Sequence, residues 1–83
     1  MIDAAVLTGL SRSVATELAV QTLLGASTLL SEGRPPAELR ADVTSPGGTT
    51  AAGLRELEDH GLRAAFAAAI EAATRRSEEL GKT

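Results

Sequence analysis

This chain of 83 residues contains no cysteine and almost no aromatic residues. It has no cysteine and one histidine, His60, so it lacks the material for disulfides or thiolate metal ligands, and we expect no metal site. Phe66 is the only aromatic residue, and much of the 43% hydrophobic content is alanine. A domain this small with few large apolar side chains has a thin core, and association with another chain is the usual remedy.

Basic charge and long apolar runs are also scarce. The formal net charge of −3 and the pI near 5.0 argue against a nucleic-acid partner, which favours a basic face. No uninterrupted apolar run approaches the roughly 20 residues of a membrane-spanning helix, and the N-terminus lacks the pattern of a signal peptide. We therefore expect a cytoplasmic protein without a membrane partner.

The pattern of the sequence is helical throughout. No alternating, β-branched stretch indicates a strand, whereas glycines and prolines separate segments with helical spacing. Ser11 or Ser13 is suited to cap the second of these segments. The sequence thus predicts an all-α fold with helices over residues 2–8, 12–31, 36–42, 51–59 and 62–80.

The predicted helix over residues 12–31 is apolar around most of its circumference. Leu18 and Leu23 belong to a broad apolar face, while Val20 and Leu24 project from the opposite side. A helix of this kind is buried on more than one side, so we expect a homodimer with this helix at its centre. The alternative is the central helix of a monomeric bundle.

The last predicted helix differs, because its apolar residues form a single stripe at spacings of three and four. Its alanines permit close contact with another helix. We interpret the stripe as core or interface and not as a site; it consists of Leu62, Phe66, Ala69, Ile70, Ala73, Ser77 and Leu80.

A turn rich in glycine and hydroxyl groups, Ser45-Pro46-Gly47-Gly48-Thr49-Thr50, stands directly before a predicted helix. The first N–H groups of a helix have no partner within it, and the helix dipole places partial positive charge there. Such a turn suits a small anion such as a carboxylate. The alternative is an ordinary helix start, in which Pro46 and Gly47 reverse the chain and a threonine caps the helix.

Other polar groups have simpler interpretations. His60 stands at the predicted end of a helix, where an imidazole caps carbonyl groups, and we expect this role and not catalysis. The acidic residues Glu56, Glu58 and Asp59 are interpreted as a solvated helix face and not as metal ligands.

Residues 42–63 resemble the signature of pyrroline-5-carboxylate reductase, and the resemblance continues in residues 18–26, 36–40 and 71–80. It covers nearly the whole chain, but only the C-terminal dimerisation domain of the family. The resemblance implies a small helical bundle that interlocks with a second subunit, with residues 1–83 forming one dimerisation and substrate-loop domain. It implies a homodimer and leaves higher oligomers open.

The family reduces 1-pyrroline-5-carboxylate to L-proline with NADPH or NADH. The resemblance assigns substrate binding to Ser45, Gly48, Thr49 and Thr50. It also assigns Thr50 a catalytic role, a hydrogen bond to the ring nitrogen of the substrate.

The cofactor fingerprint of the family is missing from this sequence. No G-x-G-x-x-G occurs, and no strand–helix unit could hold one, so we expect the family's N-terminal dinucleotide-binding domain to be absent from this chain. The chain alone is then expected to bind no cofactor and to be inactive. The alternatives are a non-catalytic dimerisation module, such as a truncated gene product, and a carboxylate-binding module without catalysis.

Overall fold

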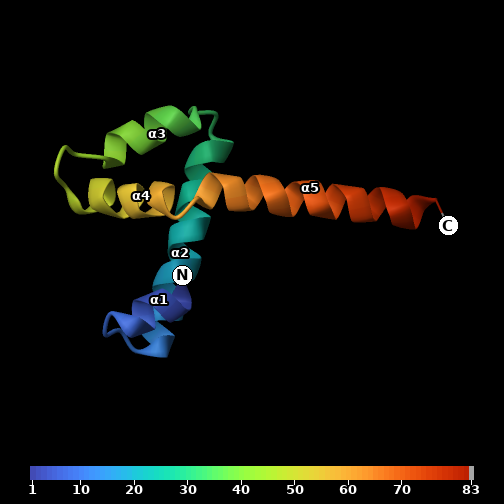
Figure 1. Ribbon diagram of the computed structural model, residues 1–83. Helices are drawn as coiled ribbons and strands as arrows, with labels where there is room; N and C mark the ends of the chain where they lie inside the picture. Colours follow the sequence, from blue (N-terminus) through green and yellow to red (C-terminus); the bar gives the residue numbers. More distant parts are fainter. Residues whose placement is uncertain (83) are drawn as a thin grey trace. The chain divides into compact units, whose positions relative to one another are not determined.

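The computed structural model describes residues 1–82, and within this range it contains helices and no strand (Figure 1). The prediction of an all-α fold is confirmed. The chain divides into two compact units, one from Met1 to Ala41 and one from Asp42 onward. The helices are α1 (Ile2–Leu7), α2 (Arg12–Ser31), α3 (Pro36–Val43), α4 (Thr49–Asp59) and α5 (Leu62–Gly81).

The helix ends agree with the predicted ones to within two residues, and the largest difference is at α4. A start at residue 51 was wrong, because the helix begins at Thr49. The N–H of Ala52 already donates to the carbonyl of Gly48 at 3.1 Å, which closes the first helical turn two residues early. Smaller differences occur at α1, which ends at Leu7, and at α3 and α5, each of which extends one residue further than predicted.

In the first unit, α1 folds back against the first half of α2 (Figure 1). Gly9 makes the reversal with φ of +112°, a backbone conformation that favours glycine. The Ser11 hydroxyl then caps α2 by accepting a hydrogen bond from the Val14 N–H at 3.3 Å, as predicted. Among the described residues only Ala15 and Ala19, on the side of α2 that meets α1, are buried.

The remaining surface of α2 is apolar and open. Leu18 is 52% exposed, and Val20 and Leu24 are each 57% exposed, although Val20 also borders a groove between α1 and α2. Although no uninterrupted apolar run is present, α2 is long and apolar enough to cross a membrane by length and composition, with a mean hydropathy of 1.2. An apolar core helix of a soluble protein and a signal sequence pass the same test, so this property alone does not assign α2 to a membrane.

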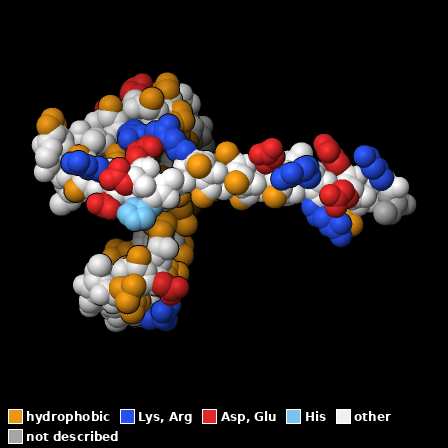
Figure 2. Space-filling model, viewed as in Figure 1, with side chains coloured by type: hydrophobic (Ala, Val, Ile, Leu, Met, Phe, Trp, Pro, Cys, Tyr) orange, Lys and Arg blue, Asp and Glu red, His pale blue; other side chains and the backbone are white. Residues whose placement is uncertain are grey.

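In the second unit, α4 leads into α5 through a tight turn. Gly61 has φ of +72°, and the Nδ1 atom of His60 lies 2.9 Å from the carbonyl oxygen of Glu56, which it caps as predicted. Arg63 of α5 pairs with the Glu58 carboxylate of α4 at 2.8 Å. Charged side chains gather over the C-terminal half of α5, whereas its first half shows mostly apolar ones (Figure 2).

Candidate functional site

The turn before α4 is closed by one backbone hydrogen bond. The N–H of Gly48 donates to the carbonyl of Ser45 at 3.0 Å, with Pro46 and Gly47 between them. Gly47 has φ of +72°. Proline followed by a residue with positive φ is the arrangement of a type II turn, so these two residues shape the reversal as the sequence predicted.

Gly48 has a different role in the turn, because a side chain at this position would be crowded by Ser45. A Cβ atom on Gly48 would lie 3.2 Å from the carbonyl oxygen of Ser45 and 3.4 Å from its Cβ atom. A side chain at this position would therefore require the Ser45 carbonyl to shift by a few tenths of an ångström. Because the Gly48 N–H already has a partner, the contribution of Gly48 to a binding site is the close return of the backbone and not a free donor.

The free donors begin one residue later. Gly48 is the N-cap residue of α4, and no side chain of the described chain caps this helix end. The N–H groups of Thr49, Thr50 and Ala51 therefore point out of the first turn without a partner in residues 1–82. The interpretation in which a threonine side chain caps the helix was wrong. Ala51 was missed because the helix was expected to start there.

Two hydroxyl groups flank these donors. Ser45 stands at the start of the turn and is exposed, whereas Thr50 is half-buried on the first turn of α4. Thr49, also exposed, adds a third hydroxyl group. The structure thus brings all four predicted site residues into one short segment, with unpartnered N–H groups and hydroxyls near the positive end of the helix dipole. This arrangement can bind a small carboxylate.

A groove of about 570 Å³ runs from this turn along one side of α4. Its far end is charged, with Arg55, Glu56 and Asp59, and its near end is formed by the glycines of the turn. Neither His60 nor the acidic residues form a reactive cluster: His60 binds a carbonyl group and Glu58 is held by Arg63. Over residues 1–82, no group of three or more His, Cys, Asp or Glu side chains is placed to hold a metal ion.

Comparison with known proteins identifies the domain. The family described as pyrroline-5-carboxylate reductase dimerisation matches residues 1–80. The pyrroline-5-carboxylate reductase of Corynebacterium melassecola is 53% identical over 83 residues, which are 99% of this chain and 31% of the relative. That of Synechocystis is 51% identical, with the same coverage of 99% and 31%. The chain therefore spans about a third of the length of these curated relatives.

Solved structures show the same fold. A Plasmodium falciparum pyrroline carboxylate reductase with NADP bound superposes with a TM-score of 0.87 and 38% identity, covering 92% of this chain and 29% of that one. The 1-pyrroline-5-carboxylate reductase of Streptococcus pyogenes has a TM-score of 0.80 at 38% identity, covering 84% and 27%. This chain therefore belongs to the pyrroline-5-carboxylate reductase dimerisation family.

Proposed function

We propose that this chain provides dimerisation and the substrate-carboxylate site of a cytoplasmic pyrroline-5-carboxylate reductase. The complete enzyme reduces 1-pyrroline-5-carboxylate to L-proline with NADPH or NADH, in proline biosynthesis. The observation that carries the proposal is the uncapped start of α4, where N–H groups of Thr49, Thr50 and Ala51 lack partners in a chain of this family.

The carboxylate of the substrate binds at these N–H groups. Hydrogen bonds from uncharged N–H donors to an ionised acceptor are stronger than those between neutral groups, and the dipole of α4 adds to the attraction. Ser45 donates its hydroxyl from the other side of the turn. Gly48 keeps the backbone close enough for both sides of the turn to reach one ligand.

Thr50 acts on the reacting end of the substrate. Its N–H helps to hold the carboxylate, and its hydroxyl lies beside the ring nitrogen of the bound imine. A hydroxyl can both donate and accept a hydrogen bond, so it can support this nitrogen as the C=N bond is reduced and the nitrogen becomes an amine. Thr50 is therefore the catalytic residue of this segment.

The residues described here do not fit a nicotinamide dinucleotide. The sequence has no G-x-G-x-x-G, and residues 1–82 contain no strand that could precede a phosphate-binding turn. The site for NADPH or NADH therefore belongs to a dinucleotide-binding domain outside this segment, and the chain by itself is expected to show no turnover.

Dimerisation is supported by the exposed apolar surface. Two alanines are the only buried side chains in the described part of the chain, and both sides of α2 remain open. A second copy of the chain covers these faces. Neither a membrane nor a nucleic acid is part of the proposal, because the family match accounts for the apolar helix and the acidic charge gives nucleic acid no basic surface.

The test is a chimera in which this segment replaces the corresponding C-terminal part of the Corynebacterium enzyme. The chimera should reduce pyrroline-5-carboxylate, and Thr50→Val should lower kcat by about tenfold, the value of one ordinary hydrogen bond that forms in the transition state. If the contact is equally strong in the ground state, KM rises instead.

Thr8→Val is the matched control, because the Thr8 hydroxyl binds the carbonyl of Ala5 in the other unit, far from α4 in the sequence. Both variants must be equally folded and dimeric. An unchanged Thr50→Val enzyme, or a Thr8→Val enzyme with the same loss, would show that the reacting hydroxyl has been wrongly assigned.

A second candidate is a dimerisation module without catalysis. It needs only the exposed apolar surface of α2 and not the substrate site. The two candidates differ in the chimera: a module that has lost the substrate site yields a dimeric but inactive enzyme, and the first proposal then fails.

A further inference from the structure

A basic side chain, Arg55, lines the groove of about 570 Å³ that runs from the Ser45–Thr50 turn along α4. Between the turn and Arg55 the lining residues are glycines and alanines, and beyond Arg55 the lining is acidic. Arg55 is therefore the first charged residue that a ligand bound at the turn would meet. No large side chain of the lining separates it from the glycines.

The geometry of an α-helix allows Arg55 to reach the turn. The Cα–Cβ bonds of a helix tilt toward its N-terminus, so a long side chain covers the surface of the turn that precedes its own Cα atom. Arg55 stands four residues after Ala51, which is about 6 Å along the helix axis. Because Ala51 and Ala52 are small and line the groove, the guanidinium group can extend over them to the unpartnered N–H groups at the start of α4.

The side chain of Arg55 is not engaged with a carboxylate of the chain. Within residues 1–82 this exposed side chain takes part in no hydrogen bond or ion pair, whereas Arg63 is paired with Glu58 at 2.8 Å. Asp59 stands four residues after Arg55, but a basic residue on the N-terminal side of an acidic one is the weaker order for such a helical pair. Glu56 is the next residue, and adjacent residues of a helix do not face each other. The guanidinium group is thus available to a ligand in the groove.

We infer that Arg55 binds the carboxylate of the substrate together with the N–H groups at the start of α4, and that it gives the site its preference for anionic substrates. This inference rests on the proposed function and adds one residue to the proposed site. A planar guanidinium group donates two parallel hydrogen bonds to a carboxylate, and such charge-assisted bonds are stronger than those from neutral donors. Glu56 and Asp59 repel a carboxylate from the far end of the groove, which keeps it near the turn.

The test compares two cyclic imines that differ only in the carboxylate, 1-pyrroline-5-carboxylate and 1-pyrroline, in the chimera with the Corynebacterium enzyme. Arg55→Gln should lower kcat/KM for the carboxylate substrate by about tenfold, mainly through KM, because a hydrogen bond to a charged group is lost. The same variant should leave kcat/KM for 1-pyrroline unchanged, since this ring has no carboxylate to bind. Arg55→Lys should retain part of the preference, because it keeps the charge but not the two parallel donors.

The salt dependence of KM gives a second readout that does not need 1-pyrroline. Attraction between exposed charges is screened by salt, so KM for pyrroline-5-carboxylate should rise with ionic strength in the wild-type chimera. In Arg55→Gln this rise should be clearly less steep. An equally steep rise in both proteins would contradict the inference.

Arg75→Gln is the matched control. It removes the same charge from an exposed arginine of α5 that also lacks an ion pair within residues 1–82, and it should leave the kinetics with both substrates unchanged. Equal losses with both substrates in Arg55→Gln would indicate a structural role and overturn the inference, as would equal kinetics in Arg55→Gln and Arg75→Gln. A wild-type chimera that does not reduce pyrroline-5-carboxylate would instead refute the proposed function, and this inference with it.

Discussion

The helices α2 and α5 have the same length, 20 residues, but differ in how their apolar side chains are distributed. Helix α2 carries the two buried side chains of the described chain and leaves apolar residues open on opposite sides. Helix α5 has no buried residue, one apolar stripe and a charged second half. The comparison shows that α2 needs partners on several sides, whereas α5 needs only one.

The two helices also start differently. The Ser11 side chain caps α2, whereas α5 begins after Gly61 in the left-handed conformation without a side-chain cap. The first turn of α5 is connected to α4 by the ion pair between Arg63 and Glu58, which is partly exposed and therefore contributes only about 0–1 kcal/mol. A side-chain cap therefore stabilises the start of α2, whereas the start of α5 has only the backbone turn at Gly61 and one ion pair to α4.

The largest effect is expected from charges on the second side of α2. In Val20→Glu/Leu24→Glu, two carboxylates replace side chains that we propose to be buried in the dimer. Each lost apolar side chain costs about 1.5–3 kcal/mol, before the burial of charge is added. The chain should dissociate or unfold, as measured by sedimentation and circular dichroism.

Gln21→Glu is the control for this change, because it adds a charge to α2 at a position that is already polar and lies between Val20 and Leu24 in the sequence. It should leave the dimer intact. A folded, dimeric Val20→Glu/Leu24→Glu chain would show that α2 needs only one partner, like α5, and would remove the difference between the two helices.

A smaller effect is expected on α5, where only one face needs cover. Phe66→Ala removes the largest apolar side chain of the stripe, which is worth about 1.5–3 kcal/mol when buried and therefore weakens dimerisation by roughly 10- to 100-fold. Helical content at high chain concentration should be unchanged. The dissociation constant from sedimentation equilibrium measures the effect, with Glu78→Ala on the charged half as the control. Equal dissociation constants for the two variants would place the stripe outside the interface.

The comparison also shows which features of the fold could be predicted from the sequence. Helical periodicity and glycine stops predicted the five helices of the described residues. The apolar pattern on both sides of α2 predicts burial in a dimer, and the exposure of Val20 and Leu24 in the single chain leaves that burial a prediction. These features are local, and they depend on the spacing of side chains along one helix. The turn at Pro46 and Gly47 was predictable for the same reason, since each residue has a strong backbone preference.

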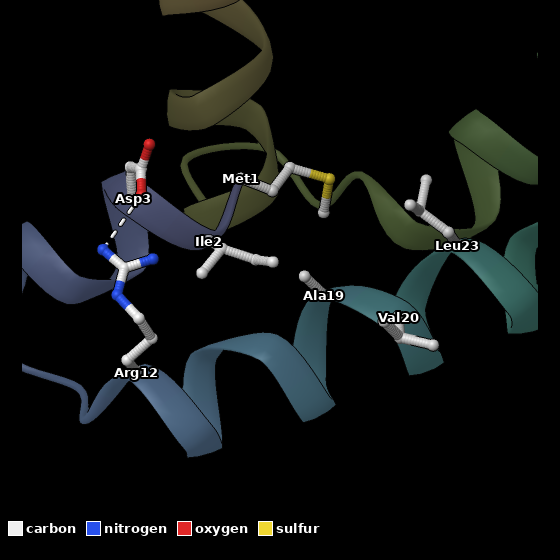
Figure 3. Close-up of a pocket in the computed structure, with 7 residues that line it drawn as sticks. All are labelled: Met1, Ile2, Asp3, Arg12, Ala19, Val20 and Leu23. Carbon is white, nitrogen blue, oxygen red and sulfur yellow. Dashed lines mark hydrogen bonds and ion pairs between the residues drawn. The ribbon is translucent and has the colours of Figure 1, made fainter.

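The details of the site could not be predicted from the sequence. The N–H of Gly48 is engaged with Ser45, so the free donors shift to Thr49, Thr50 and Ala51. A hydrogen bond that closes a turn determines this shift, and residue types alone do not show whether it forms. The sequence also did not predict the apolar groove between α1 and α2, which is lined by Ile2, Ala19 and Leu23 among others (Figure 3). This groove depends on how α1 packs against α2 and not on any motif.

The smallest expected effect concerns the cap of α2 and tests whether its start is locally stabilised. Ser11→Ala removes the hydroxyl that accepts from the Val14 N–H, a change that costs about 1 kcal/mol at helix N-caps. Urea unfolding at fixed chain concentration measures the loss, since stability and dimerisation are coupled. Ser13→Ala is the control, because Ser13 also lies in the first turn of α2 but its side chain does not cap the helix. Ser11→Asp should retain the wild-type stability, since aspartate also caps and favours the positive end of the dipole. Equal losses in Ser11→Ala and Ser13→Ala would mean that the side-chain cap does not stabilise the start of α2.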